Sequence, residues 1–470
     1  MNLRGGIDTK PTDFFILAKI NVPFDDRETI VAALKALHLV AQEKMHPARG
    51  HGFHRNPDGT RTQPRLAVKD FGLNILTAFG LRFFLGPLAD RKNEEVVQNF
   101  PPGGLFTPRP VSRFGITERN APLYLRTMNA SGDRDWVAKR LTETAGGTAP
   151  AEAEAEIGKA YFDWLANAES DILLQMECDN RFLAVDLWDA VRKGFIEKFG
   201  LTLVSMQEAF NRGDGRDHTG FQDGTSNLQD KMISDPMWYR SKVYLPHPAP
   251  AYPGEAAFRR DDPRYDGGTY LVHRKYIEHL DKFNAEDFEV SDHYGKTFKG
   301  APACLHAIGR ERESGKVISR SNHELLEREP DSTEVNLGYN ESHVLKARGG
   351  ITAPFEAPFP PLTIEENKPE QPCNVFNTQD IRIRRRGVNF AEIDPNTGRV
   401  TYGLHFICFQ NNIQQTGFEF VNNIWLMNPL FRRSTDGLFN PKAGVITPVE
   451  GCYYFVPPES REYSGDVFFE

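Results

Sequence analysis

The sequence has few cysteines and no long apolar run. Its cysteines are widely spaced and include no C-x-x-C pair, and there are five of them: Cys178, Cys304, Cys373, Cys408 and Cys452. This spacing argues against a disulfide framework and against a zinc site of the usual kind. No stretch approaches about eighteen consecutive apolar residues, so no membrane-spanning helix and no membrane partner are expected.

The first residues also lack the apolar core of a secretory signal. The chain begins MNLRGG, and Asp13 precedes the first hydrophobic run. We therefore expect the chain as given to be cytoplasmic, and export of a processed form stays open.

An excess of positive charge is missing as well. Lys and Arg together number 56 against 64 Asp and Glu, which gives a formal net charge of -8. Because binding to phosphates relies on a basic surface, nucleic acid is not expected as a partner. Hydrophobic residues make up 39% and charged residues 26% of the chain. This is the composition of a globular protein and excludes the disordered and fibrous classes.

The two halves of the sequence show the same order of expected elements: strand, helix, strands, helix, strand. In the first half, strands are expected at Phe14–Val22, Asn74–Phe84 and Asp171–Met176, and helices at Arg27–Glu43 and Phe182–Phe199. In the second half, strands are expected at Gly268–Val272 and Val400–Gln410, and helices at Lys275–Phe283 and Thr416–Met427. A chain of 470 residues exceeds the size of one ordinary domain. We predict an α+β fold of two ferredoxin-like split βαβ domains, residues 1–205 and 206–470, each an antiparallel sheet with helices packed on it.

Four short segments of the second half contain candidate functional residues. Residues 220–224 (GFQDG) place Asp223 between two glycines, where a ligand can approach closely. Residues 342–348 contain His343, and residues 382–387 contain three consecutive arginines. Taken singly, these segments have plainer explanations as an Asp-Gly turn, a surface or core histidine and a strand with solvated basic residues.

The fourth segment, residues 403–409 (GLHFICF), reads as a strand with two distinct faces. Side chains alternate along a strand, so Leu404, Phe406 and Cys408 share one face, whereas His405 and Ile407 share the other.

In this order, the four segments resemble the dye-decolourising (DyP-type) haem peroxidase family. Residues 267–272 (GGTYLV) and the early run Asn74–Phe84 resemble corresponding strands of the family, so the resemblance covers much of the chain. It implies one haem b per chain, held without covalent attachment in the C-terminal ferredoxin-like domain. The absence of a C-x-x-C-H motif agrees with non-covalent binding.

The resemblance also implies roles for individual residues. His343 is expected to be the proximal ligand of the haem iron, with Asp223 and Arg385 as the distal catalytic pair. Arg385 points to the strand face opposite Arg384 and Arg386, so only one of these arginines is expected to reach the haem.

Further residues are expected around the haem. Leu404 and Phe406 would line the distal pocket, and Asn227, Lys346 and Arg348 are candidates for holding the propionates. A proximal histidine donates its second ring N–H to an acceptor, for which Asp436 is the choice and Glu419 the alternative.

The predicted function is a haem-dependent peroxidase that uses hydrogen peroxide to oxidise dyes, phenols or other small aromatic reductants. A carboxylate can accept and return the peroxide proton, a guanidinium can stabilise the developing charge, and an imidazole can ligate iron. A haem-binding protein that removes iron from haem with little turnover is one alternative. A cofactor-free α+β dimerisation module is another. The Pro-rich residues 354–372, between His343 and Arg385, leave the haem entrance and the substrate range open, and the sequence names neither the physiological reductant nor the oligomeric state.

Overall fold

The computed structural model describes most of both halves of the chain. All statements below concern the described residues, which are 6–9, 11–45, 71–88, 113–116, 122, 125, 127–128, 131–144, 153–222, 228–246, 263–291, 295–318, 342–348, 381–413, 416–427, 436–439, 444–459 and 462–470.

The first half contains a four-stranded antiparallel sheet with the order β4-β1-β3-β2. Its strands are β1 (Phe14–Asn21), β2 (Asn74–Gly80), β3 (Ile172–Cys178) and β4 (Thr202–Phe210). Its helical segments are α1 (Arg27–Met45), α2 (Leu81–Leu85), η3 (Arg113–Gly115), α3 (Ser131–Thr144), α4 (Ala153–Ala168), α5 (Arg181–Val191) and η5 (Arg192–Glu197).

Local sequence explains where two of these helices begin. The Asp26 carboxylate accepts a hydrogen bond from the Thr29 backbone N–H before α1, and the Asn180 side chain accepts two before α5. The strand predicted over Asn74–Phe84 ends earlier than expected. It stops at Gly80, where a Cβ atom would lie 2.2 Å from the Ser170 carbonyl oxygen, and residues 81–85 are helical.

The second half repeats this topology. Its sheet has the order β11-β5-β10-β9, with strands β5 (Thr269–Glu278), β9 (Val388–Ile393), β10 (Val400–Gln410) and β11 (Ile446–Val456). The other strands are β6 (Glu289–Ser291), β7 (Thr297–Lys299) and β8 (Arg384–Arg385). The helical segments are α6 (Gln229–Ser234), α7 (Pro236–Val243), η7 (Pro263–Tyr265), α8 (Leu280–Phe283), α9 (Ala301–Ile308), α10 (His343–Arg348), η9 (Phe420–Leu426) and η11 (Asp466–Phe468).

One expected helix of the second half is partly wrong. The prediction began a helix at Lys275, but residues 275–278 continue β5, and only α8 is helical. β5 pairs along its length with β10 on one side and β11 on the other. The backbone hydrogen bonds of these two ladders outweigh the local preference of residues 275–278.

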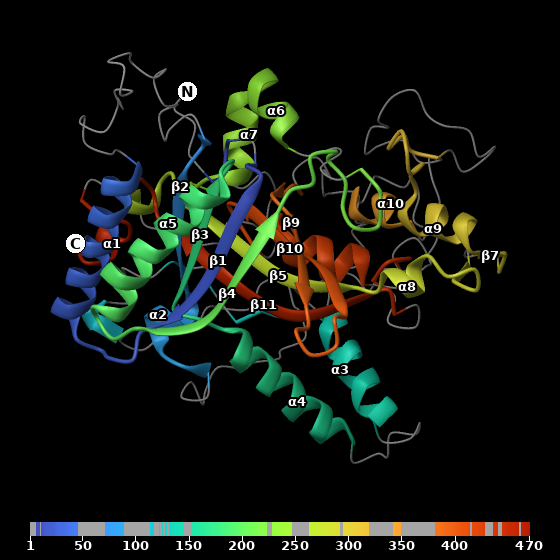
Figure 1. Ribbon diagram of the computed structural model, residues 1–470, viewed down its shortest axis with the longest axis horizontal. Helices are drawn as coiled ribbons and strands as arrows, with labels where there is room; N and C mark the ends of the chain where they lie inside the picture. The colour runs from blue at the N-terminus through green and yellow to red at the C-terminus, as the bar shows by residue number, and fades with distance from the viewer. Residues whose placement is uncertain are drawn as a thin grey trace, which may run out of the picture.

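The two four-stranded sheets join at both edges, and their pairings form one closed ring of strands. Figure 1 shows the strands at the centre of the molecule, with α1 and α5 at one end and α8, α9 and α10 at the other. β2 pairs with β11 through Phe79 and Gly80, and β4 pairs with β9 through Phe210 and Asn389. The α+β prediction of two ferredoxin-like antiparallel sheets is confirmed, and the closure joins them. The division at residues 205 and 206 stays a prediction, and β4 runs across this position.

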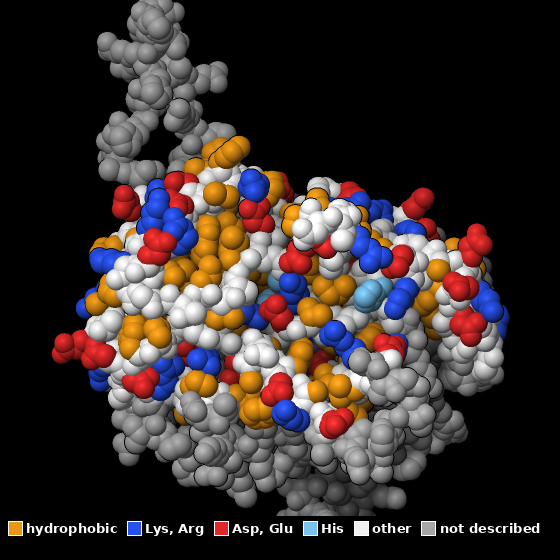
Figure 2. Space-filling model, turned by 60° about the horizontal axis from the view of Figure 1, so that its bottom comes forward, with side chains coloured by type: hydrophobic (Ala, Val, Ile, Leu, Met, Phe, Trp, Pro, Cys, Tyr) orange, Lys and Arg blue, Asp and Glu red, His pale blue; other side chains and the backbone are white. Residues whose placement is uncertain are grey.

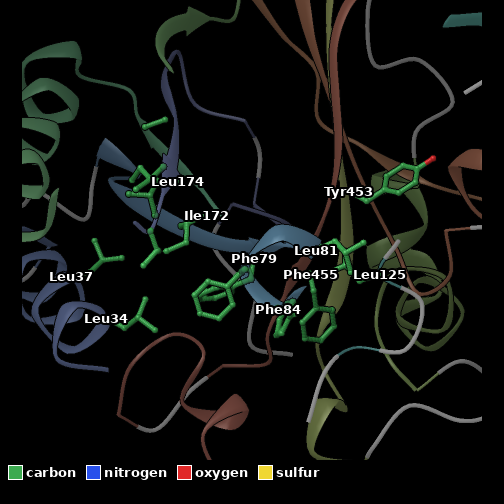
Figure 3. Close-up of a cluster of buried hydrophobic side chains, with 14 of the residues drawn as sticks. Leu34, Leu37, Phe79, Leu81, Phe84, Leu125, Ile172, Leu174, Tyr453 and Phe455 are labelled. Carbon is green, nitrogen blue, oxygen red and sulfur yellow. The ribbon is translucent and has the colours of Figure 1, made fainter. Parts of the chain in front are cut away.

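Side chains pack both inside and outside the ring. One buried cluster contains residues from β1, β2, β3, β4, β5, β9, β10 and β11, and therefore fills the interior. A second cluster packs the helices of the first half onto the outer face, where Leu34 and Leu37 of α1 lie near Ile172 of β3 (Figure 3). Phe455 of β11 belongs to the same cluster, so the two halves share a core.

A third cluster covers the outer face of the second half and involves α9, η9 and residues 438–439. Lysines and arginines are interspersed with acidic side chains over the face drawn in Figure 2. Among the described residues, no helix combines the length and the apolar character needed to cross a membrane.

Candidate active site

His343 is the first residue of α10, and close packing fixes this short helix. The preceding Ser342 is 1% exposed, and its carbonyl accepts a hydrogen bond from the Lys346 backbone N–H at 3.0 Å. Gly309 ends α9 with φ of +86°, and a Cβ atom there would lie 2.7 Å from the Ser342 side chain. α10 therefore rests directly on the end of α9.

The imidazole of His343 is oriented by Asp436. Nδ1 of His343 lies 3.1 Å from Oδ2 of Asp436, whose side chain is 1% exposed. Oδ1 of Asp436 accepts hydrogen bonds from the backbone N–H groups of Leu438 and Phe439, each at 2.9 Å. A carboxylate oxygen accepts, so Nδ1–H of His343 donates to it, and in the neutral form of this tautomer Nε2 keeps its lone pair.

Gly437 allows this support to lie against α9. A Cβ atom at Gly437 would lie 2.7 Å from Cα and 2.9 Å from Cβ of Ala307. The backbone next to Asp436 is thus in direct contact with α9, and α10 rests on the end of the same helix.

Aromatic rings connect His343 with the outer face of the sheet. The ring of His343 lies 5.4 Å from that of Phe439, and Phe439 lies 5.3 Å from Tyr276 of β5. Tyr276 in turn lies 6.3 Å from Phe406 of β10. Burial raises the pKa of Tyr276 to about 12, against an opposing effect of Arg274, so its hydroxyl stays protonated.

The side chains of β10 alternate between its two faces, as predicted from the sequence. His405 and Ile407 are buried, whereas Leu404 and Phe406 are half-buried on the outer face. Arg385 of β8 pairs in register with Cys408, so its side chain leaves the sheet on the same outer face as Leu404 and Phe406.

The two arginines that flank Arg385 are turned away from this face and are buried. Arg384 and Arg386 are 0% and 2% exposed, and Arg386 forms an ion pair with Glu177 of β3. One arginine of the three therefore faces the same side as Phe406.

Asp223 and Asn227 lie outside the described residues, but the loop before them is well anchored. Arg216 donates hydrogen bonds to the carbonyls of Gly220 at 2.8 Å and Glu313 at 2.7 Å. Arg216 also forms an isolated β-bridge with Gln222, the residue before Asp223. The loop is thereby held beside the turn that follows α9.

Three further residues were predicted around the haem or beside His343, namely Lys346, Arg348 and Glu419. The side chain of Arg348 and the Pro-rich residues 354–372 lie outside the described residues, and Lys346 is 0% exposed. Glu419, the alternative acceptor, accepts a hydrogen bond from the Tyr453 hydroxyl at 2.9 Å. Sequence reasoning missed Tyr276, because a helix was predicted where β5 continues; the alternation of residues 270–276 was the available signal.

These residues fit a haem. Among the described residues, Nε2 of His343 has no hydrogen-bond partner, and its ring lies against an apolar aromatic wall. A neutral imidazole whose second nitrogen donates to a carboxylate is the usual axial ligand of haem peroxidases.

The chain belongs to the DyP-type peroxidases. Residues 214–461, more than half of the chain, match the family described as Dyp-type peroxidase, C-terminal. No curated protein sequence matches the chain.

Solved structures show the same fold. A DyP-type peroxidase from Cellulomonas bogoriensis is similar with 19% identity and a TM-score of 0.55, covering 100% of this chain and 97% of that one. Ferric DtpA from Streptomyces lividans has 16% identity, a TM-score of 0.58 and coverages of 100% and 96%. A DyP-type peroxidase from Streptomyces coelicolor has 17% identity, a TM-score of 0.57 and the same coverages.

Family membership establishes the activity. The protein is a haem-dependent peroxidase, an oxidoreductase with haem b as cofactor that takes hydrogen peroxide and a reductant as substrates. The family match does not favour the alternative of a haem-binding protein with little turnover.

Proposed function

We propose that His343 would hold the haem iron through Nε2 and that Asp436 sets the orientation and basicity of its imidazole. The observation that carries this proposal is the 3.1 Å contact between Nδ1 of His343 and Oδ2 of Asp436. It leaves Nε2 as the free donor atom, next to the ring of Phe439. Bound haem supplies the redox-active iron that takes oxidising equivalents from peroxide and passes them to the reductant.

We further propose that Asp223 and Arg385 would act on the peroxide that reaches the haem. The Asp223 carboxylate accepts the proton from one peroxide oxygen and returns it to the other. The Arg385 guanidinium stabilises the negative charge that develops on the leaving oxygen and keeps its own proton throughout. Arg385 supports this role by leaving the sheet on the face of Phe406.

The remaining proposed contacts shape access and anchoring. Leu404 and Phe406, half-buried on the outer face of β10, restrict entry to peroxide and other small molecules. Asn227 and Arg348 hold the propionates. We propose that the reductants are small aromatic compounds such as dyes and phenols, because an aromatic wall stabilises flat apolar molecules through stacking. Residues 206–470 would form the haem-binding domain and residues 1–205 its partner.

Replacing His343 tests this assignment. We expect His343→Ala to fold and to lose most of its haem and its Soret band after purification, since the axial ligand is gone. The matched control is His38→Ala, which removes a half-buried histidine from α1 in the other half of the molecule. Normal haem content and an unchanged Soret spectrum in His343→Ala would disprove the assignment of the ligand.

A further inference from the structure

The strand that carries Arg385 is very short. β8 contains only residues 384 and 385, and it pairs with β10 at two positions, Phe409 and Cys408. One more backbone bond follows, from the N–H of Arg386 to the carbonyl of Ile407 at 2.7 Å. Each such bond contributes only modestly to stability, so this short ladder alone fixes the strand weakly. The position of Arg385 therefore depends on side-chain contacts as well.

Arg386 ties this strand to the sheet of the first half. Its side chain lies inside the ring, where it forms an ion pair with Glu177 of β3 and donates a hydrogen bond to the carbonyl of Thr9. Both members of the ion pair are buried. Oε1 of Glu177 also lies 3.4 Å from the side-chain nitrogen of Asn74 in β2, which donates to it. Removing one partner of a buried ion pair leaves the other charge uncompensated, so this contact strongly favours one position of Arg386.

Arg384 ties the strand to the segment of residues 6–9 through Tyr239. Its side chain is 0% exposed and hydrogen-bonds to the hydroxyl of Tyr239 in α7. This hydroxyl donates to Oδ1 of Asp8 at 2.7 Å, and both of these residues are buried. Nη1 of Arg384 also donates to the carbonyl of Arg385 at 2.8 Å. The same guanidinium thus contacts the interior of the molecule and the backbone of Arg385.

The two inward contacts determine the direction of Arg385. Side chains alternate along a strand, so Arg384 and Arg386, held inside the ring, direct Arg385 to the outer face. Arg385 is half-buried there. Burial raises the pKa of the Cys408 thiol, and the positive charge of Arg385 opposes this rise, as expected for a guanidinium close to the thiol.

We propose, on the basis of the role proposed above for Arg385, that Glu177 and Tyr239 are positioning residues for its guanidinium. Glu177 acts through Arg386, and Tyr239 acts through Arg384. Neither touches the peroxide, but together they hold β8 in the position from which Arg385 reaches it. Small displacements of a catalytic group are costly, because charge stabilisation depends on exact placement. Since Glu177 belongs to β3, the first half of the molecule takes part in the reaction of the second.

Glu177→Gln and Tyr239→Phe test the proposal in the haem-loaded enzyme. Each should slow the reaction with peroxide by about tenfold, less than the about 10²–10³-fold expected when Arg385→Leu removes the charge itself. In the Arg385→Leu background neither substitution should slow the reaction further, because both act through the same group. Hydrogen exchange followed by mass spectrometry should be faster at residues 384–386 in both variants. Tyr239→Phe loses a single hydroxyl and keeps the test decisive if Glu177→Gln does not fold.

The matched control is Asp171→Asn, which changes another buried carboxylate that pairs with an arginine, Arg113, at 3.0 Å. It should lower stability but leave both the peroxide rate and the exchange at residues 384–386 unchanged. Unchanged exchange there in Glu177→Gln and Tyr239→Phe would overturn the proposal, and so would equal slowing in the Arg385→Leu background. A wild-type rate in Arg385→Leu alone would instead disprove the role proposed for Arg385, and the exchange data would still decide whether the two residues hold the strand.

Discussion

At the scale of single residues, Asp436 combines two tasks. It accepts one hydrogen bond from His343 and two from the backbone N–H groups of Leu438 and Phe439. The backbone bonds hold the carboxylate in one orientation, so the imidazole cannot rotate without breaking its own bond. A carboxylate acceptor also makes an imidazole more basic and so stabilises the higher oxidation states of a bound iron.

Replacing Asp436 with Asn should therefore raise the reduction potential of the haem iron. Loss of the charge leaves the imidazole less electron-rich, and we expect a rise of about 60 mV, which corresponds to tenfold in a one-electron equilibrium. Spectroelectrochemical titration measures it. Glu419→Gln is the matched control, because Glu419 bonds to Tyr453. A potential that moves equally in both variants would exclude a specific effect of Asp436.

The proposed distal residues should differ in their response to pH. Asp223→Asn removes a proton acceptor, which typically contributes about 10²–10⁴-fold to a reaction rate. Arg385→Leu removes a positively charged hydrogen-bond donor, whose loss lowers a rate by about 10²–10³-fold. Both should slow the reaction with peroxide while haem stays bound. With Asp223 present, the rate should fall at acid pH as the carboxylate is protonated, and Asp223→Asn should lose this acid limb. Rapid-mixing spectra across pH measure the rates, and wild-type rates in both variants would contradict the assignment.

At the scale of elements, the segment that orients His343 is held by the contact between residues 436–439 and α9. This contact depends on a glycine at position 437, where a Cβ atom would lie 2.7 Å from Cα of Ala307. A backbone atom cannot move aside as a flexible side chain can. The two segments would have to separate, and Asp436 would move with its segment.

Gly437→Ala should thus lower both the free energy of unfolding and the affinity for haem. Overpacking of this kind costs about 1–3 kcal/mol. The control is Gly158→Ala in α4, where an added Cβ meets nothing within 4 Å and should stabilise the helix by about 0.5–1 kcal/mol. Denaturant unfolding and haem titration measure the two effects. A Gly437→Ala protein as stable as the wild type would show that the contact is not needed.

At the scale of the whole molecule, the closed ring of strands encloses polar groups as well as apolar ones. Nε2 of His405 lies 2.8 Å from Oε1 of Gln207, and because an amide oxygen can only accept, His405 donates from Nε2–H. In a neutral His405 ring, Nδ1 then accepts from Nε2–H of His273 at 2.9 Å. This arrangement requires His405 to be neutral, because its Nδ1 accepts a hydrogen bond. Burial, first of all, and nearby positive charges including Lys19 lower the pKa of His273 well below its usual value, and burial likewise lowers that of His405.

The lowered pKa values predict a loss of stability in acid. Below about pH 6.5 the unfolded histidines bind protons that the folded ones do not, so the free energy of unfolding decreases as the pH falls. The slope is about 1.4 kcal/mol per pH unit for each proton taken up. Urea unfolding between pH 8 and pH 5 measures it. The double variant His273→Gln/His405→Gln should show a flatter slope, His38→Gln should not, and an unchanged slope in the double variant would assign the effect to other groups.

Much of the fold and part of the site could be predicted from the sequence. The alternation of residues 403–409 identified both faces of β10, because the direction of a side chain from a strand is a local property. Four short motifs in order were sufficient for the family, which the match over residues 214–461 confirms. Asp436 was chosen as the partner of His343 because a histidine that binds iron donates its second ring N–H to an acceptor.

Other features depended on contacts between distant parts of the chain. Residues 275–278 have a pattern that fits a helix, and only the ladders with β10 and β11 make them a strand. The ring closes because Phe79 meets Phe455 and Phe210 meets Asn389, and neither pair leaves a local signal. Likewise, His343 and Asp436 are 93 positions apart, and the packing of Gly437 on α9 brings them together. The sequence by itself determined the faces of strands and the kinds of residue available for catalysis. The tertiary structure decided which of them meet, because such contacts form only when the closed sheet and α9 are in place.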